Sequence, residues 1–367
     1  MKKVIICLFF LCSLPSFLLA NYTPYFTYTP EDLHSLWDLR SNHTMSNEEL
    51  RKWDYIACSA IDENKLNFYD QTRMLTYLYV AQAESAFLSY TASGELSGSL
   101  DPISDQVLSL FLSNYSHPSL YQEDAYSQAL AKIVLTKIEE RIKKENALTF
   151  AYVVPKQDQI TFSAGLESAK WIPWCAKPSI AYWPPPPPNS SDPVWKEQIL
   201  IIKNAQTPMT EEKKLAIYRW AGLAYPWSND WRSIVNAYLF CHHIPLQKNL
   251  EIRSVVMIGL YDSVIAYVGC KYHYLVVRPQ VYDPTVIYEI PVPKHPSYPS
   301  GHSTESTLTA TIMSFYFPID AEYWHHLALQ CCLSRIWAGI HYPLDDLGGR
   351  ACGRKVAQSV LERCAQK

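Results

Sequence analysis

The sequence lacks a block of lysines and arginines. Lys and Arg number 32 against 35 Asp and Glu, which gives a formal net charge of −3 at pH 7. Proteins that bind the phosphate backbone of nucleic acid usually present a basic surface, and binding to an acidic membrane surface needs clustered positive charge. The composition therefore argues against nucleic acid and against a membrane surface as partners.

Strand patterns and zinc-type cysteine pairs are also missing. Alternation of apolar and polar residues is at most a short piece near 151–154, and no internal repeat is found. No Cys-x2-Cys pair occurs, so a structural zinc site has little support. Cys241-His242-His243 contains metal-ligating residue types, but adjacent residues on a regular helix cannot all face one ion. The sequence predicts no metal site and an all-α fold.

The N-terminus carries an export signal. Lys2 and Lys3 precede an apolar core from Val4 to Leu11, and Ala20 is a small residue suited to cleavage. Residues 1–20 are thus typical of a secretory signal peptide, too short to span a membrane comfortably. We expect cleavage after Ala20 and a periplasmic or extracellular protein of net charge −5. An uncleaved anchor or a lipoprotein signal is the alternative interpretation.

The mature chain has no further candidate for a membrane span. The nearest is 255–269, which Asp262 and Ser263 interrupt. Eight of the ten cysteines remain after cleavage, and an even count in an exported protein permits disulfides.

Helical periodicity covers most of the mature chain. Ser46 precedes two glutamates, a helix start, and apolar residues at helical spacing predict helices over 74–90, 122–145, 211–224, 229–242, 251–275, 302–316, 321–336 and 345–364. Between them, residues 171–193 contain the polyproline run Pro184 to Pro188. A linker is the alternative interpretation of this segment. Its tryptophans and tyrosines favour a strap, packed on a single helical body that begins at about Met45.

Three patterns in the last hundred residues carry chemistry. The first is Lys271-x6-Arg278-Pro279. Seven residues make almost two helical turns, so both cations would project from one helix face, about 10 Å apart along the axis, until Pro279 ends the helix. Unpaired charge beside a core is costly, and a bound oxyanion would offset that cost. Two snorkelling side chains at a solvated edge are the alternative.

The second pattern is Pro299-Ser300-Gly301-His302, where a proline-rich loop enters a helix. Free amides at Ser300, Gly301 and His302 would form an anion site at the helix N-terminus. The third is Ser334-Arg335-x5-His341-x3-Asp345. Asp345 could accept the second ring N–H of His341, which fixes the tautomer and raises the basicity of the other nitrogen, as a histidine nucleophile requires. A histidine that only caps a helix is the alternative.

Together these motifs resemble the three signatures of the type 2 phosphatidic acid phosphatase/vanadium haloperoxidase superfamily. Softer similarity outside them extends over most of the mature chain, and the absence of membrane spans resembles the soluble branches. The resemblance implies a helical bundle of the acid phosphatase/haloperoxidase type with an N-terminal helical extension. It divides the chain into a signal peptide at 1–20, a helical region with the strap at 21–205, and a catalytic region at 206–367.

The resemblance also implies roles for single residues. Lys271, Arg278 and Arg335, with the amides of Ser300 and Gly301, would bind the oxygens of phosphate or vanadate. The nucleophile, or the axial vanadium ligand, would be His341, oriented by Asp345. His302 would be the acid that protonates the leaving oxygen, held cationic by bound phosphate or an acidic neighbour.

The motifs serve two chemistries. A histidine at position 295, seven before His302, is similar to the bromoperoxidase branch and marks a possible outer site. Val268 departs from the Trp or Arg typical of haloperoxidases, and the interval from His302 to Arg335 is short, as in compact acid phosphatases. We therefore expect a phosphatase of small phosphorylated substrates without a cofactor. The alternatives are a vanadate-dependent haloperoxidase and a phosphate- or vanadate-binding protein without turnover.

Overall fold

The computed structural model describes residues 22–113, 115, 124–148, 164–175, 177–223 and 230–365. These residues form helices and a single isolated bridge, Thr44–Ser97, without any β-strand. The predicted all-α fold is confirmed. The helices are α1 (Pro30–Trp37), α2 (Asn47–Glu63), α3 (Phe68–Ser93), α4 (Asp101–Phe111), α5 (Ala125–Asn146), α7 (Val194–Gln206), α8 (Glu211–Trp220), α9 (Trp231–Cys241), α10 (Leu246–Tyr274), α11 (Pro279–Tyr282), α12 (Gly301–Tyr316), α13 (Ala321–Trp337) and α14 (Pro343–Ala365), with 3-10 turns η2 (Leu166–Lys170), η3 (Ser179–Tyr182) and η4 (Pro318–Asp320).

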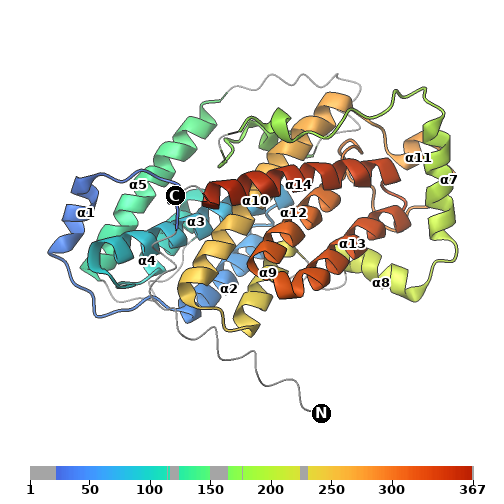
Figure 1. Ribbon diagram of the computed structural model, residues 1–367. Helices are drawn as coiled ribbons and strands as arrows, with labels where there is room; N and C mark the ends of the chain where they lie inside the picture. The colour runs from blue at the N-terminus through green and yellow to red at the C-terminus, as the bar shows by residue number, and fades with distance from the viewer. Residues whose placement is uncertain are drawn as a thin grey trace, which may run out of the picture.

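Helix α10 is the axis of the molecule. It packs against α3 on one side and against α12 and α14 on the other, so it joins the N-terminal helices to the C-terminal ones (Figure 1). Nearly every residue from Asn249 to Tyr272 is buried. This helix is long and apolar enough to cross a membrane, but its apolar window is wholly buried inside the fold, as expected of a core helix.

The first helices are set by strong local signals. Ser46 caps α2 with its side chain, and Glu49 returns a bond to the Ser46 amide, which completes a capping box. Asn67 caps α3, and Gly94 ends it in the left-handed conformation at φ 77°. Helices α4 and α5 pack on α3, so this region forms one continuous hydrophobic core with α10.

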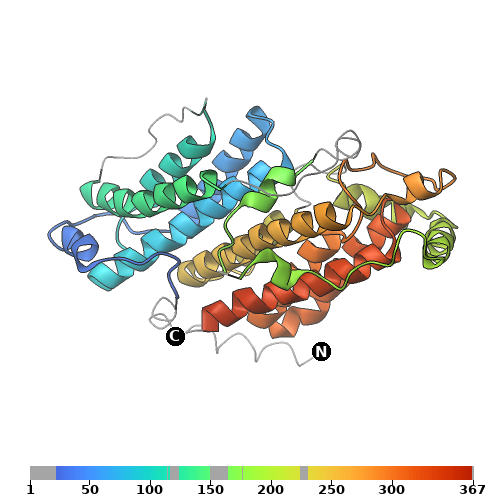
Figure 2. The same cartoon turned by 90° about the horizontal axis from the view of Figure 1, so that it is seen from above.

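Residues 171–175 and 177–193 lie on the body as a strap. Figure 2 shows it in green, running along α10 and α14. Its large aromatic side chains are 9 % exposed or less: Trp171, Trp174, Tyr182 and Trp183. The prediction of a packed strap is confirmed, and the linker alternative is wrong.

A buried carboxylate of α10 anchors the strap. Asp262 accepts backbone N–H bonds from Trp174 and Cys175 at 2.8 and 3.0 Å. The Trp171 ring stacks on Tyr261 at 4.8 Å between centroids. Asp262, which interrupts the apolar pattern of α10 in sequence, thus has a structural purpose.

Two sequence predictions need correction, and others fall outside the described residues. Helix α10 ends at Tyr274, because Leu275 adopts φ 52°, so Lys271 and Arg278 do not share a helix and Pro279 begins α11. The short helix α1 was not predicted. Residues 1–20 and the possible strand at 151–154 lie outside the described residues. The eight cysteines Cys58, Cys175, Cys241, Cys270, Cys331, Cys332, Cys352 and Cys364 are free thiols.

Candidate active site

The N-terminus of α12 forms one wall of the site. Ser300 is the N-cap residue, and its hydroxyl oxygen accepts the amide N–H of Ser303. The amide of Ser300 itself donates to the carbonyl of Asp345 at 3.0 Å, so it is not available to an anion, contrary to the prediction. Among the described residues no acceptor is found for the amides of Gly301 and His302, the first two of the helix.

Two glycines of α14 allow this helix to lie close against the N-terminal part of α12. A Cβ atom at Gly349 would lie 2.5 Å from the Ser300 carbonyl oxygen, and one at Gly353 would lie 2.3 Å from the Thr304 carbonyl oxygen. Only glycine lets the backbones of α12 and α14 approach this closely. The approach brings Asp345, in the first turn of α14, beside Ser300.

His341 and Asp345 form the predicted pair. His341 Nδ1 lies 2.8 Å from Asp345 Oδ2, and both side chains are buried. The same carboxylate oxygen accepts the Ser297 hydroxyl at 2.5 Å and the Tyr342 amide at 2.9 Å. Because Nδ1 faces a carboxylate, it carries the proton and leaves the lone pair on Nε2. The second carboxylate oxygen, Oδ1, is buried and has no partner among the described residues.

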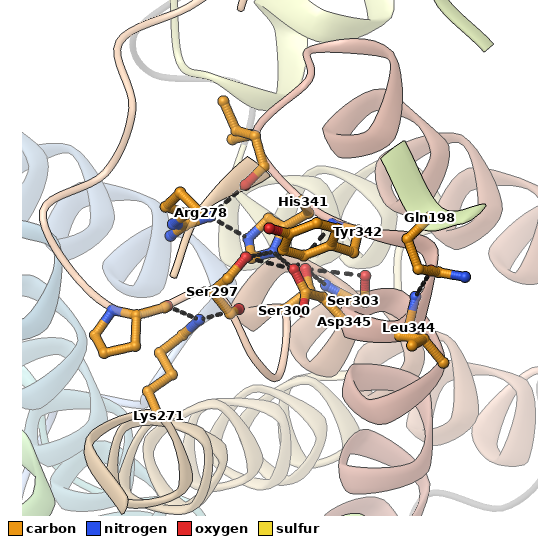
Figure 3. A network of polar contacts seen from close by, with 12 residues as sticks. Gln198, Lys271, Arg278, Ser297, Ser300, Ser303, His341, Tyr342, Leu344 and Asp345 are labelled. Atoms are coloured by element: carbon orange, nitrogen blue, oxygen red, sulfur yellow. Dashed lines mark hydrogen bonds and ion pairs between the residues drawn. The ribbon is translucent and has the colours of Figure 1, made fainter. Parts of the chain in front are cut away.

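Lys271 reaches the site from the last turn of α10. Its Nζ donates to the carbonyl oxygens of Pro296 and Ser297, both at 2.8 Å, as Figure 3 shows. The side chain is fully buried. Burial and the neighbouring Arg278 lower the pKa of Lys271 well below its ordinary value. An ammonium group has three N–H donors, so one remains beyond these two carbonyls.

Arg278 lies directly against the candidate nucleophile. Its Nη1 donates to the Ile340 carbonyl at 2.6 Å and lies 3.0 Å from His341 Nε2 (Figure 3). Its Nε donates to the His295 carbonyl at 3.1 Å. Arg278 and Asp345 therefore occupy opposite ring nitrogens of His341.

His295, the possible outer residue, contacts Arg278. Its Nδ1 lies 3.1 Å from Arg278 Nη2 and 3.2 Å from the Pro296 carbonyl oxygen. One nitrogen cannot accept from the first and donate to the second, so one of these contacts is not a hydrogen bond. Burial, Lys271 and Arg278 lower the pKa of His295, which keeps the ring neutral.

Arg335 stands at the end of α13. Its Nη2 donates to the Ile217 carbonyl at 2.9 Å and its Nε to the Ser334 hydroxyl at 3.0 Å. Its Nη1 has no acceptor among the described residues. The side chain is 1 % exposed, and burial lowers its pKa to about 10. The guanidinium stays positive at neutral pH, and its Nη1 can still donate hydrogen bonds to a ligand.

His302 is fixed by a residue far away in sequence. Its Nε2 lies 2.9 Å from the Trp220 carbonyl, an acceptor, so Nε2 carries the ring proton. Burial and Arg335, followed by Arg278 and Lys271, lower the pKa of His302 to about 3. No carboxylate is among the causes. His302 is therefore neutral, and among the described residues no carboxylate forms a hydrogen bond with its ring.

The same forces act on His341. Burial and then Arg278 and Lys271 lower its pKa well below the ordinary value. For Asp345, burial raises the pKa to about 6 in spite of the Ser297 hydroxyl and Lys271, which act in the opposite direction. At neutral pH the pair is therefore a carboxylate and a neutral imidazole, with the basic nitrogen Nε2 turned toward the cations.

A cavity of about 760 Å³ opens over this cluster. Residues of the site that line it are His295, Gly301, His302, Arg335 and His341. Lys271, Arg278, Ser300 and Asp345 do not line it and lie behind the wall. The sequence motifs therefore meet in one place, but only some of the predicted anion ligands line the cavity.

Three participants were missed by sequence reasoning. Ser297 and the Tyr342 amide hold the Asp345 carboxylate, and the Trp220 carbonyl fixes the His302 ring. Ser297 stands two residues before the second motif, in the same proline-rich loop, so its hydroxyl was a usable signal. Trp220 is 82 residues from His302, and no local pattern marks a backbone carbonyl.

The arrangement can hold an oxyanion. Among the described residues, Lys271, Arg278 and Arg335 have no carboxylate within salt-bridge distance, and Asp345 is hydrogen-bonded to the neutral His341 instead. Buried positive charge with spare N–H donors favours a tetrahedral or trigonal anion. His341 Nε2, a lone pair beside these cations, can attack phosphorus or coordinate vanadium. Both phosphate and vanadate fit this donor set.

Comparisons with known proteins give one family match and several similar folds. Residues 252–362 match the PAP2 superfamily. The fold is similar to that of a bacterial vanadium-dependent iodoperoxidase, with 15 % identity, a TM-score of 0.69, and coverage of 88 % of this chain and 98 % of that one. It is also similar to a bacterial vanadium-dependent chloroperoxidase in its apo form, with 14 % identity, a TM-score of 0.54, and coverage of 79 % and 83 %. No curated protein matches the chain.

Proposed function

Because residues 252–362 belong to the PAP2 superfamily, which joins phosphatases and vanadium haloperoxidases, we propose that this chain is an exported phosphatase that hydrolyses phosphate monoesters through a phosphohistidine. The observation that carries the proposal is His341. Its Nδ1 is bound to the buried Asp345, and its Nε2 lies 3.0 Å from Arg278 Nη1. A phosphate- or vanadate-binding protein without turnover would not need this oriented imidazole.

The first step is positioning. Arg278, Arg335 and the third N–H of Lys271 bind the oxygens of the phosphoryl group, together with the amides of Gly301 and His302. Phosphoryl transfer depends mainly on positioning and on stabilising charge spread over these oxygens. Arg278 turns one donor from His341 Nε2 to the anion, which frees the lone pair. Nε2 then attacks phosphorus, the bond to the leaving oxygen breaks, and Asp345 stabilises the imidazolium.

The leaving oxygen needs a proton. His302 is neutral in the free protein, with a pKa lowered to about 3, so the proton arrives with the substrate. The second pKa of a phosphate monoester is about 6, so below that pH the substrate binds as a monoanion that still carries one proton. Negative charge on the bound phosphate then favours proton transfer to His302 Nδ1, since Nε2 is held by Trp220. We therefore expect a mildly acidic optimum, and the pH–rate curve should fall on the alkaline side as the substrate loses its second proton.

Trapping tests the nucleophile. Enzyme mixed with a labelled phosphate monoester and quenched in alkali, where phosphoramidates survive, should carry label on His341. His341→Ala should abolish labelling and turnover, whereas His302→Ala should accumulate label with substrates that have good leaving groups. Label on His302 would contradict the assignment. So would an equal loss of activity of His302→Ala toward substrates with good and with poor leaving groups.

A second candidate function is vanadium-dependent halide oxidation, favoured by His295 in contact with Arg278. Vanadate would be held by the same cations and by His341 Nε2, and it would supply activation of peroxide. The paired assay is p-nitrophenyl phosphate hydrolysis against bromination with peroxide after vanadate loading. Bromination without hydrolysis would replace the phosphatase proposal.

A further inference from the structure

The cavity is also lined by a carboxyl group that has no part in the proposed mechanism. Glu305 stands three residues after His302 on α12, one turn along, so the two side chains emerge from the same face of the helix. Both line the cavity. The Tyr267 hydroxyl donates to Glu305 Oε1 at 3.0 Å. Among the described residues the carboxyl has no other partner, and no cation forms a salt bridge with it.

The surroundings of Glu305 keep it uncharged. Burial raises its pKa to about 8, against the bond from Tyr267, and the negative charge of Asp230 adds to the rise. The titratable groups that face it come from five elements: Tyr69 on α3, Asp230 before α9, Tyr267 and Lys271 on α10, His302 on α12 itself, and Cys331 on α13. A neutral carboxyl group has one O–H to donate.

The rest of the cavity wall is mainly apolar. It includes Phe68, Leu75, Met257, Leu260, Trp231 and Ile290. The charged groups in this part of the wall are few. Asp230 and Arg232 form an ion pair at 3.1 Å, and Lys294, next to His295 in sequence, also lines the cavity. A volume of about 760 Å³ far exceeds the needs of a phosphoryl group and is in the range of pockets for larger organic ligands.

We propose that Glu305 is a specificity-determining residue whose neutral carboxyl donates a hydrogen bond to an uncharged oxygen of the substrate's organic group. The substrate class is a phosphate monoester of a large, mainly apolar, uncharged alcohol. The inference rests on the proposed function for the phosphate end of the substrate. Tyr267 orients the carboxyl from α10, and the apolar wall covers the remainder of the organic group.

Charge selection follows from the same residue. Above its pKa Glu305 loses the donor proton and becomes an anion one helical turn from the bound phosphate. Substrate binding then weakens through like-charge repulsion and through loss of the hydrogen bond. A Gln side chain imitates the neutral acid at every pH, because its amide still donates and never ionises.

The experiment measures binding of two ligands that cannot be turned over. Inorganic phosphate reports the anion site, and a naphthyloxymethylphosphonate, with an ether oxygen as acceptor, reports the cavity as well. Dissociation constants of wild type, Glu305→Gln and Glu305→Ala are measured by calorimetry at pH 7 and pH 9, with thermal melts to verify folding.

At pH 7 the aryl ligand should bind wild type and Glu305→Gln equally within about threefold, and Glu305→Ala about tenfold more weakly, as expected for one hydrogen bond. Inorganic phosphate should bind all three alike at pH 7. At pH 9 Glu305→Gln should bind the aryl ligand more tightly than wild type does.

The outcomes separate the two proposals. If wild type binds neither ligand, the proposed function fails, and this inference with it. If phosphate binds but the aryl ligand gains nothing, or if Glu305→Gln is as weak as Glu305→Ala at pH 7, the specificity role is wrong and the anion site stands. Should Glu305→Ala not fold, the comparison of wild type with Glu305→Gln at the two pH values still decides.

Discussion

Buried charge is handled differently in the two halves of this molecule. In the N-terminal half, Glu145 is 4 % exposed and bonds Arg73, Tyr261 and the Ile172 amide. Across α10, Lys271, Arg278 and Arg335 are as deeply buried, and among the described residues no carboxylate pairs with them. The first group has its partners within the chain, and for the second we propose that an anion supplies the missing negative charge.

The difference shows what each group contributes. A buried charge with all of its partners ties elements together: Glu145 of α5 holds α3, α10 and the start of the strap. Uncompensated buried cations cost stability in the free protein and return it when an anion binds. The fold stabilised by groups such as Glu145 therefore tolerates a strained charge distribution at the site.

The largest expected effect is the removal of an anion ligand. Arg278→Ala should lower phosphate affinity by about 10²- to 10⁴-fold, because two charge-assisted hydrogen bonds of about 1.5–3 kcal/mol each are lost. Calorimetric titration with phosphate measures it. The matched control is Lys203→Ala, which removes a partly exposed cation that is paired with Asp283 and does not line the cavity. An equal loss of phosphate affinity in both variants would mean that phosphate responds to net charge and not to a specific site.

The next effect concerns the complete group. Glu145→Ala should lower the free energy of unfolding by about 3–5 kcal/mol, because Arg73 is left without its buried partner. Urea denaturation measures the change. Phosphate affinity of the folded variant should equal that of wild type. A large loss of phosphate affinity in this variant would mean that the two groups are coupled through α10.

A smaller effect joins the two regions. At a phosphate concentration of 100 times the dissociation constant, wild type should gain about 2.7 kcal/mol of stability. Glu145→Ala should show the same gain from a lower starting point, and Arg278→Ala should show none at that concentration. Thermal melts with and without phosphate decide this. A gain retained by Arg278→Ala would point to phosphate binding elsewhere.

The smallest effect is the pH response of the anion-free protein. The folded pKa of His302, about 3, is below its unfolded value near 6.5. The unfolded state then binds more protons in this window, so stability is complete above about pH 6.5 and falls as the pH drops toward 3. His302 is partly exposed, so we expect on the order of 1 kcal/mol. His302→Gln should show a flatter curve in denaturation between pH 6.5 and 4, and an unchanged curve would contradict the assigned shift.

Local patterns predicted the site where its parts are close in sequence. His341 and Asp345 are four residues apart across a helix start, and the predicted contact is present. The helix from Lys271 to Arg278 was wrong, because the left-handed conformation of Leu275 is no strong preference of leucine and was not visible in the pattern. Ser300 was assigned a free amide, which the close approach of α14 consumes. Long-range contacts of backbone groups decide such details.

The fold could be predicted for the same reason. Apolar spacing and a cap such as Ser46 act within one helix, so they indicate it without knowledge of the rest. Apolar spacing alone placed the next helix at 74–90, and α3 extends beyond that range at both ends, from Phe68 to Ser93. The strap was recognised from its aromatic content, but its anchor was not. Asp262 was taken only as an interruption of an apolar stretch, since its partners are the amides of Trp174 and Cys175, 88 and 87 residues away.

The contact of Arg278 Nη1 with His341 Nε2 has a consequence for chemical reactivity. While the guanidinium donates to this nitrogen, its lone pair is a poor target for alkylating or acylating reagents in the surrounding medium. In the proposed mechanism, an oxyanion competes for the same N–H and uncovers the imidazole only when a phosphoryl group is in place. The proposed nucleophile would then be protected until the ligand that should react with it removes the protection.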